Sequence, residues 1–266
     1  MGNLVSDLTL LLKFYKSLGF ESIPTVFGEV ENRKPHIEQS NLDYSAKDMT
    51  DAIYEKITTS MLTTQEKSEA LSSLFQEIGD CKRCRLSEGR NNIVFGEGNV
   101  NTRIMFIGEG PGRDEDLQGR PFVGRAGDIL TSLINKMGKE EGFERKDVFI
   151  ANVVKCRPPM NRDPMPDEIE TCLPFLNRQI EIIMPEIIIS LGRISTHTLM
   201  GLKTPLNKFS ISEARGKFFE YKIKNFSIPV MPTFHPAYFL RNPKDKHLTW
   251  SDAMAVLDRL KSTRSK

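Results

Sequence analysis

The chain has 266 residues, of which 39% are hydrophobic and 27% are charged, and its formal net charge at pH 7 is +2. This length allows one substantial core with an appendage, and no segment approaches the run of about 20 apolar residues that a membrane span requires, so an integral membrane protein is excluded. The charge is unevenly divided: residues 1–80 carry 7 Lys/Arg and 13 Asp/Glu, and the remainder carries 30 and 22. The positive excess in the C-terminal part is compatible with a polyanionic partner such as nucleic acid, or with ordinary solvated faces.

Residues 1–65 are predicted to form an N-terminal extension made of a helix and a linker. Residues 4–18 place apolar side chains at helical spacing before Gly19, which predicts a short amphipathic helix. Residues 28–64 are polar and weakly patterned, which favours a linker. A second helical pattern at residues 64–78 leads to Cys81, and we place a second domain over residues 66–266. The first 20 residues lack the cleavage site of a signal peptide, so we expect a cytoplasmic protein.

All four cysteines fall into two spaced pairs, Cys81 with Cys84 and Cys156 with Cys172. Four thiolates suit a tetrahedral zinc ion or an iron–sulfur cluster, and a C-x-x-C turn presents two of them together. Fifteen residues separate Cys156 from Cys172, which places these ligands on different elements and suits a bulky cluster better than a compact zinc knuckle. The alternative is two disulfides or four unrelated thiols, and a reducing cytosol together with the metal-like spacing disfavours it. The spacing therefore predicts a metal centre, with zinc and iron–sulfur both open.

From Cys81 onward, short apolar strands alternate with amphipathic helices. The predicted strands are residues 103–107, 148–154, 187–191 and 230–233, and the predicted helices are residues 127–137, 167–184, 194–200 and 247–261. This alternation predicts an α/β fold with an open, mainly parallel sheet that has helices on both faces. Ligands of such folds bind in the loops where strands end.

Polar motifs follow three of the predicted strands. The first strand leads into residues 108–116 (GEGPGRDED) and 119–127 (GRPFVGRAG), the second into 152–162 (NVVKCRPPMNR), and the last into 235–243 (HPAYFLRNP). Asn152 can offer both a donor and an acceptor to a planar ligand, and His235 is a candidate for electrophilic or acid–base work. Neither a P-loop nor a dinucleotide-binding fingerprint is present. The ordinary expectation for an acidic run such as 114–116 is a solvated loop, and Lys155 and Arg157 beside Cys156 are expected to contact phosphate or solvent.

Together, the cysteine pattern and the three loop motifs closely resemble the family 4 uracil-DNA glycosylases, the iron–sulfur branch of the uracil-DNA glycosylase superfamily. The resemblance covers residues 81–260. It implies a three-layer α/β/α fold with a small central, mainly parallel four-stranded sheet. It also implies a [4Fe–4S] cluster on Cys81, Cys84, Cys156 and Cys172, whose role would be structural because glycosidic hydrolysis transfers no electrons.

The resemblance also implies roles for single residues. His235 matches the family histidine that faces O2 of the leaving uracil, Asn152 matches the residue that reads N3–H and O4, and Phe122 matches the aromatic that stacks on the flipped base. Glu109 and Glu115 match acidic positions, one of which orients water or excludes the thymine methyl group. Further matches around the base are Gly110, Pro111, Gly112 and Asn161, and a loop pressed into the minor groove would carry Leu240 and Arg241.

The function that this resemblance implies is hydrolytic excision of uracil from single- and double-stranded DNA, which leaves an abasic site for base excision repair. The enzyme would act as a monomer associated with the nucleoid. Gly110 stands where other branches carry an aspartate general base, which favours a dissociative route. Two alternatives are a non-catalytic nucleic-acid-binding module stabilised by zinc or iron–sulfur, and a superfamily member that crosslinks to the abasic product. The latter carries an inserted basic loop with a histidine, and no Lys-Arg-Arg-Ile-His-like insertion is found here.

Overall fold

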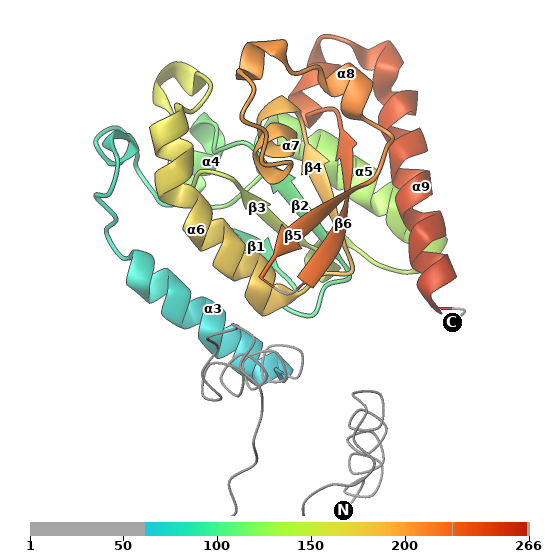
Figure 1. Cartoon of the computed structure of the whole chain (residues 1–266), viewed down its shortest axis with the longest axis horizontal. Coiled ribbons are helices and arrows are strands. Elements are labelled where there is room, and N and C mark those ends of the chain that lie inside the picture. The colour runs from blue at the N-terminus through green and yellow to red at the C-terminus, as the bar shows by residue number, and fades with distance from the viewer. Residues whose placement is uncertain (1–61, 225, 265–266) are drawn as a thin grey trace, which may run out of the picture. The chain divides into compact units, whose positions relative to one another are not determined.

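The computed structural model describes residues 62–224 and 226–264, which contain a six-stranded sheet with the order β1-β3-β2-β4-β6-β5 (Figure 1). Its four central strands are parallel to one another: β3 (Phe149–Asn152), β2 (Ile104–Gly108), β4 (Ile187–Leu191) and β6 (Phe226–Thr233). Each corresponds to one of the four predicted strands. The α/β class with a mainly parallel sheet is therefore confirmed.

Two antiparallel edge strands extend the predicted four-stranded sheet to six. β1 (Glu97–Gly98) pairs with β3, and β5 (Phe219–Ile223) pairs with β6. β1 is only two residues long, so no periodic pattern can announce it. In β5, exposed and buried residues mix along a half-solvated edge, whereas β2, β3 and β4 are buried throughout. A continuous apolar run predicts only strands that are covered on both faces.

The helices connect the strands and cover the sheet. Their bounds are α3 (Thr64–Ile78), α4 (Arg113–Gln118), α5 (Arg125–Glu141), α6 (Pro166–Ile183), α7 (Arg193–Leu199), α8 (Ile211–Ala214) and α9 (Lys246–Arg264). The predicted helices at residues 64–78, 127–137, 167–184, 194–200 and 247–261 are all present. None of the helices in this part of the chain is long and apolar enough to cross a bilayer.

Successive residues of the central strands point to opposite faces of the sheet and build two separate cores. Met105 and Ile107 of β2 join the core beneath α6, together with Leu176, Ile180 and Ile183. Ile104 and Phe106 join the core beneath α5 and α9, together with Leu130, Ile134, Met137, Val256, Leu257 and Leu260. Figure 1 shows the resulting layers, with α6 on one side of the sheet and α5 and α9 on the other.

The acidic run at 114–116 forms part of helix α4, so the expectation of a solvated loop is wrong. Acidic side chains are favourable in the first turn of a helix, where the backbone N–H groups lack partners. Asp116 is fully buried, and its carboxylate accepts hydrogen bonds from the backbone N–H and the side-chain Nδ2 of Asn91 at 2.8 and 2.5 Å. The carboxylate therefore anchors the loop that precedes β1.

The predicted helix at residues 4–18 and nearly all of the predicted linker lie outside the described residues. The domain boundary near residue 65 therefore stays a prediction. At the start of the described part, Thr63 caps α3 through a reciprocal pair of hydrogen bonds with Glu66. Leu71 then packs into the core beneath α6 and Leu74 packs against Phe175 of α6, so α3 belongs to the same folded body as the sheet.

Candidate active site and cysteine centre

A pocket of about 280 Å³ lies at the carboxyl ends of β2, β3 and β6, which is where open α/β sheets bind their ligands. Nine residues predicted from the motifs line it together: Glu109, Gly110, Pro111, Gly112, Glu115, Phe122, Asn152, Asn161 and His235. Leu240 and Arg241 do not line the pocket. Both are exposed at the end of the 3-10 turn η5 (Pro236–Leu240), beyond His235.

Asn152 lies at the end of β3, opposite Gly108 of β2 in the register of the sheet. Its side chain is 1% exposed, and among the described residues its Oδ1 is a buried polar atom with no hydrogen-bond partner. A Cβ on residue 108 would collide with this Oδ1 and with the ring of Phe122, so only glycine fits there. Asn152 thus presents an unpaired acceptor beside a buried aromatic ring, as a planar ligand with an N–H would require.

His235 follows β6 and is positioned by its own loop. The backbone N–H of Ala237 donates to Nδ1 of His235 at 3.2 Å, so in the neutral ring the proton lies on Nε2. Burial lowers the pKa of His235 to about 4, against the opposing effect of the Glu115 carboxylate. Gly192, with φ of 92°, passes so close that a Cβ would lie 2.8 Å from the Cβ of His235. The site therefore holds a neutral imidazole that can donate from Nε2.

The two acidic residues of the pocket differ in their surroundings. Burial first, and then the neighbouring Asp163 carboxylate, raise the pKa of Glu109 to about 7, while Arg193 acts in the opposite direction. Arg193 is itself paired with Asp163 at 2.6 Å. Glu109 therefore titrates near neutral pH.

Glu115 instead binds backbone. Its Oε1 accepts hydrogen bonds from the backbone N–H groups of Val123 and Gly124, both at 2.9 Å. Gly124 is the N-cap of α5, so the carboxylate occupies the place of a capping side chain at the start of that helix. The same contacts hold the segment that begins with Phe122, a residue with φ of 52°.

Asn161 stands in the 3-10 turn η3 (Pro159–Asn161), which forms one edge of the pocket. Its Oδ1 accepts a hydrogen bond from Nε of Arg157 at 2.7 Å. The carboxamide oxygen is therefore already used within the loop, unlike that of Asn152. Arg157 holds this loop, and the expectation that it serves only as a phosphate or solvent contact is incomplete.

The four cysteines surround a second, small cavity beside α6. Its lining includes Cys81, Cys84, Cys156 and Cys172, and all four thiols are free. Arg83 donates to Sγ of Cys81 at 3.3 Å and Arg90 to Sγ of Cys156 at 3.7 Å, so positive charge faces the sulfurs. Within residues 62–224 and 226–264, no group of three or more His, Cys, Asp or Glu side chains converges closely enough to hold a single metal ion.

Lys155 lies between the cysteine cavity and the pocket, and the expectation that it contacts phosphate or solvent is wrong. Its side chain is 2% exposed. Its Nζ donates to the backbone oxygen of Asn152 at 2.9 Å and to Oε1 of Gln179 at 2.5 Å, and its backbone N–H donates to Sγ of Cys172 at 3.3 Å. A buried ammonium needs such partners, and sequence alone does not reveal them.

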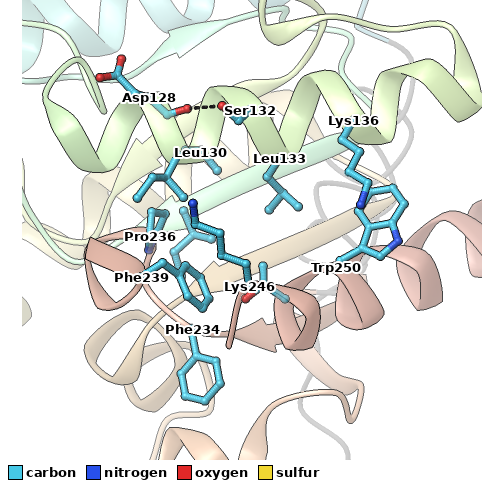
Figure 2. A pocket seen from close by; sticks show the side chains of 13 residues that line it. Asp128, Leu130, Ser132, Leu133, Lys136, Phe234, Pro236, Phe239, Lys246 and Trp250 are labelled. Carbon is cyan, nitrogen blue, oxygen red and sulfur yellow. Dashed lines mark hydrogen bonds between the residues drawn. The ribbon is translucent and has the colours of Figure 1, made fainter. Parts of the chain in front are cut away.

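A third pocket, of about 300 Å³, lies behind η5, between α5 and the start of α9. Figure 2 shows that its wall is mainly apolar, with Leu130, Leu133 and Phe239 facing it and Lys136 extended toward Trp250. The Lys136 ammonium lies 3.8 Å from the centre of the Trp250 ring. Among the described residues that line this pocket, none carries a buried acceptor without a partner, as Asn152 Oδ1 does, so the polar pocket is the better candidate for recognition of a base.

Four lining residues of the polar pocket were not among the predicted site residues: Ala126, Pro158, Arg162 and Ala237. All four lie inside the loop motifs at 119–127, 152–162 and 235–243. Their closeness in sequence to Phe122, Asn161 and His235 is the feature that could have predicted them. The pairing of Asp163 with Arg193 joins a loop to a helix and has no sequence signature.

A family model described as the uracil-DNA glycosylase superfamily matches residues 95–255. This match defines the class of protein and agrees with the fold and the pocket. Three similar curated proteins are each named type-4 uracil-DNA glycosylase. That of Saccharolobus solfataricus is 49% identical over 192 residues, 72% of this chain and 87% of the relative. That of Sulfurisphaera tokodaii is 49% identical over 69% of this chain and 82% of the relative, and that of Thermotoga maritima is 47% identical over 68% and 88%. The chain belongs to the type-4 uracil-DNA glycosylase family, and the resemblance inferred from the motifs is confirmed.

Proposed function

We propose that this protein flips uracil out of DNA and hydrolyses its N-glycosidic bond, leaving an abasic site in single- and double-stranded DNA. The observation that carries the proposal is the buried, unpaired Oδ1 of Asn152 inside a pocket with a buried aromatic ring and a neutral histidine. The curated relatives carry the name of this activity.

Asn152 selects the base. Its Oδ1 accepts from N3–H of uracil while its Nδ2 donates to O4, and Phe122 stacks on the ring. Cytosine presents an acceptor at N3 and a donor at N4, so it would face Asn152 with like groups and leave them unpaired. Leaving a buried group unpaired costs about 1–3 kcal/mol, which supplies the discrimination.

His235 stabilises the leaving group. As the glycosidic bond breaks, negative charge develops on the uracil oxygens, and a donor positioned beforehand lowers the barrier. A pKa of about 4 keeps the ring neutral at physiological pH, so Nε2–H donates a hydrogen bond to O2 without giving up its proton. This hydrogen bond strengthens as the base becomes an anion.

The sugar side of the reaction follows a dissociative route. Gly110 offers no carboxylate, and Oε1 of Glu115 already accepts from the amides of Val123 and Gly124. We assign Glu115 to positioning the Phe122 segment and Glu109 to orienting water and stabilising the sugar cation. The pKa of about 7 leaves a large fraction of Glu109 ionised at neutral pH.

The cysteine cavity is proposed to hold a [4Fe–4S] cluster on Cys81, Cys84, Cys156 and Cys172. Burial raises the pKa of the Cys156 thiol to about 12, so thiolates at this place need strong positive charge beside them. A cluster supplies that charge, and Arg83 and Arg90 supplement it. A cluster held there would brace the 81–84 turn against Cys156 of the loop that follows β3 and Cys172 of α6.

Purified protein incubated with uracil-containing and thymine-containing oligonucleotides, followed by alkali cleavage, tests the function. Only the uracil strand should break, and an intact uracil strand with folded protein would refute excision. A denaturing gel before alkali separates hydrolysis from covalent crosslinking to the product. His235→Ala and Asn152→Ala should each reduce cleavage and retain the visible absorbance of the cluster. A colourless, zinc-loaded protein would contradict the cluster assignment.

We further propose that the enzyme acts as a monomer in the cytoplasm, associated with the nucleoid.

A further inference from the structure

Met160 is the most exposed large hydrophobic residue of the described chain. Its relative exposure is 93%, compared with 41% for Leu240. It lies in η3, between Pro158 and Arg162, and both of these neighbours line the polar pocket. A single exposed apolar side chain is ordinary on a protein surface. Met160 is distinguished by its place, because it stands on a turn whose flanking residues line the pocket.

The backbone presents Met160 in a costly conformation. Met160 and Asn161 have φ of 53° and 54°, in the left-handed region that residues with a Cβ disfavour. The loop is nevertheless tied in place: the backbone N–H of Asn161 donates to the oxygen of Pro158 at 3.0 Å, and that of Arg162 to the oxygen of Pro159 at 3.1 Å. A rigid loop therefore supports a side chain that itself packs against almost nothing.

Side chains at both ends of the turn strengthen this hold. Arg157 Nε binds Oδ1 of Asn161, and the Arg162 guanidinium forms two hydrogen bonds with the buried carboxylate of Glu168 at 2.8 and 2.7 Å. Backbone strain that the surroundings maintain in this way is typical of positions that meet a ligand. Such pre-organisation lets Met160 bind without the entropic cost of ordering a loop.

Two of the loops that line the pocket also carry an exposed apolar side chain. The loop at 158–162 contributes one edge with Met160, and the loop that begins at His235 contributes another edge and continues to Leu240. A base that enters the pocket leaves a gap in its duplex, with neighbouring base pairs exposed at that gap. Methionine is one of the side chains that proteins insert between base steps, and its unbranched thioether adapts to an irregular gap.

We propose that Met160 is an apolar wedge that enters the base stack of duplex DNA beside the flipped uracil. This inference rests on the proposed function and specifies how the same site handles double-stranded DNA. Single-stranded DNA has no paired stack to separate, so the contribution of Met160 is specific to duplex substrate.

The test compares duplex with single-stranded substrate of the same sequence, both carrying one uracil. Met160→Ala should lower the duplex-to-single-strand ratio of kcat/KM roughly tenfold to a hundredfold, the range expected for losing the burial of one such side chain. Met160→Leu should restore most of the ratio, and Met160→Gln, which keeps the length but not the apolar character, should not. Met165→Ala is the matched control, because Met165 is a second exposed methionine, 44% exposed, that lies outside the turn at Pro159–Asn161.

A second measurement follows unstacking directly. Duplexes with uncleavable 2′-fluoro-deoxyuridine and a neighbouring 2-aminopurine should gain fluorescence with the wild-type chain and with Met165→Ala, but not with Met160→Ala. An unchanged ratio, equal losses on both substrates, or an unchanged fluorescence gain would overturn the wedge. A wild-type chain that cleaves neither substrate would instead refute the proposed excision, and the fluorescence arm would still decide on Met160.

Discussion

The unpaired oxygen of Asn152 is a local cost that the folded protein carries. A buried acceptor without a partner costs about 1–3 kcal/mol relative to a paired one. The lack of a side chain at Gly108 leaves the space that this oxygen and the Phe122 ring occupy. An acceptor without a partner in the free protein can bind a donor on the ligand. Asn152 therefore lowers the stability of the fold and at the same time favours recognition of the ligand.

Replacing Asn152 should therefore separate activity from stability. Asn152→Ala removes the unpaired oxygen but leaves a small cavity, and the two effects offset each other, so the free energy of unfolding should change by less than about 1 kcal/mol. Excision should fall by roughly 100-fold in kcat/KM because the selective hydrogen bonds are lost. Urea denaturation and excision kinetics measure the two quantities.

Asn177→Ala is the control with the opposite pattern. Asn177 Oδ1 accepts a hydrogen bond from the hydroxyl of Tyr221 at 2.6 Å, and neither residue lines the pocket. Its replacement should destabilise the fold by about 1 kcal/mol and leave kcat/KM at the wild-type value. A large loss of stability in Asn152→Ala would mean that Asn152 is chiefly structural.

Glu109 should set the pH dependence of excision. Its pKa of about 7 means that the ionised fraction rises through neutral pH, whereas His235, with a pKa of about 4, is neutral throughout that range. We expect the logarithm of kcat for a single-stranded substrate to rise up to about pH 7 and then to level off. The Glu109→Gln variant should be slow and flat between about pH 6 and pH 9, and an unchanged inflection in that variant would exclude Glu109 as its source.

The same residue should weaken the fold as pH rises. Between pH 4.5 and about 7 the folded state retains a proton on Glu109 that the unfolded state has lost, so the free energy of unfolding falls across this window. Glu109→Gln cannot ionise and should escape the loss. Its stability relative to wild type, from urea midpoints, should therefore be more favourable at about pH 8 than at about pH 5.

At the scale of elements, Glu115 joins α4 to the start of α5. Glu115→Ala leaves the N–H groups of Val123 and Gly124 without their acceptor, which should cost about 1–2 kcal/mol, as the loss of a helix cap does. The Phe122 wall would loosen, so we expect KM to rise more than kcat falls. The control is Asp114→Ala, on the same helix, because Asp114 pairs with the exposed Arg113. This substitution should change neither KM nor kcat. A fall in kcat alone would indicate a direct catalytic role for Glu115.

The elements that could be predicted from sequence are those buried on a consistent face. β2, β3 and β4 are continuous apolar runs because both of their faces are covered, and α3 shows a helical repeat that starts at a capping Thr63. α4 escapes this kind of prediction. Its acidic sequence looks solvated, and only the contact of Asp116 with the loop at Asn91, distant in sequence, makes burial favourable.

The pocket was predictable for a different reason. Its predicted residues lie in loops directly after parallel strands, and the carboxyl ends of such strands meet at one edge of the sheet. Which groups carry free hydrogen-bonding capacity could not be predicted, since it depends on contacts between loops. Asn152 Oδ1 is unpaired while Asn161 Oδ1 is bound by Arg157, although both are asparagines in the same motif.

At the scale of the whole molecule, Lys155 connects the cysteine cavity with the pocket. Its ammonium binds the backbone oxygen of Asn152 and Oε1 of Gln179 on α6, and Nε2 of Gln179 donates to the backbone oxygen of Phe95 at 2.9 Å. The end of β3, the middle of α6 and the segment before β1 thus meet at one buried charge. Burial lowers the pKa of Lys155 to about 8, which reflects the cost of keeping that charge inside.

Lys155→Met should therefore destabilise the protein and the pocket together. The substitution keeps the apolar stem but leaves the acceptors of Asn152 and Gln179 without their donor, at about 1–3 kcal/mol each. Adding Gln179→Leu removes one of these acceptors and should recover part of the loss, a coupling that a double-mutant cycle of urea midpoints measures. Lys82→Met, at a lysine 78% exposed and paired with Asp80, should leave the midpoint unchanged. The Asn152 carbonyl is one of the acceptors that lose their donor, so excision should decline with Lys155→Met even at temperatures where the chain stays folded. A variant with the wild-type urea midpoint and the wild-type excision rate would show that the buried charge supports neither the fold nor the pocket.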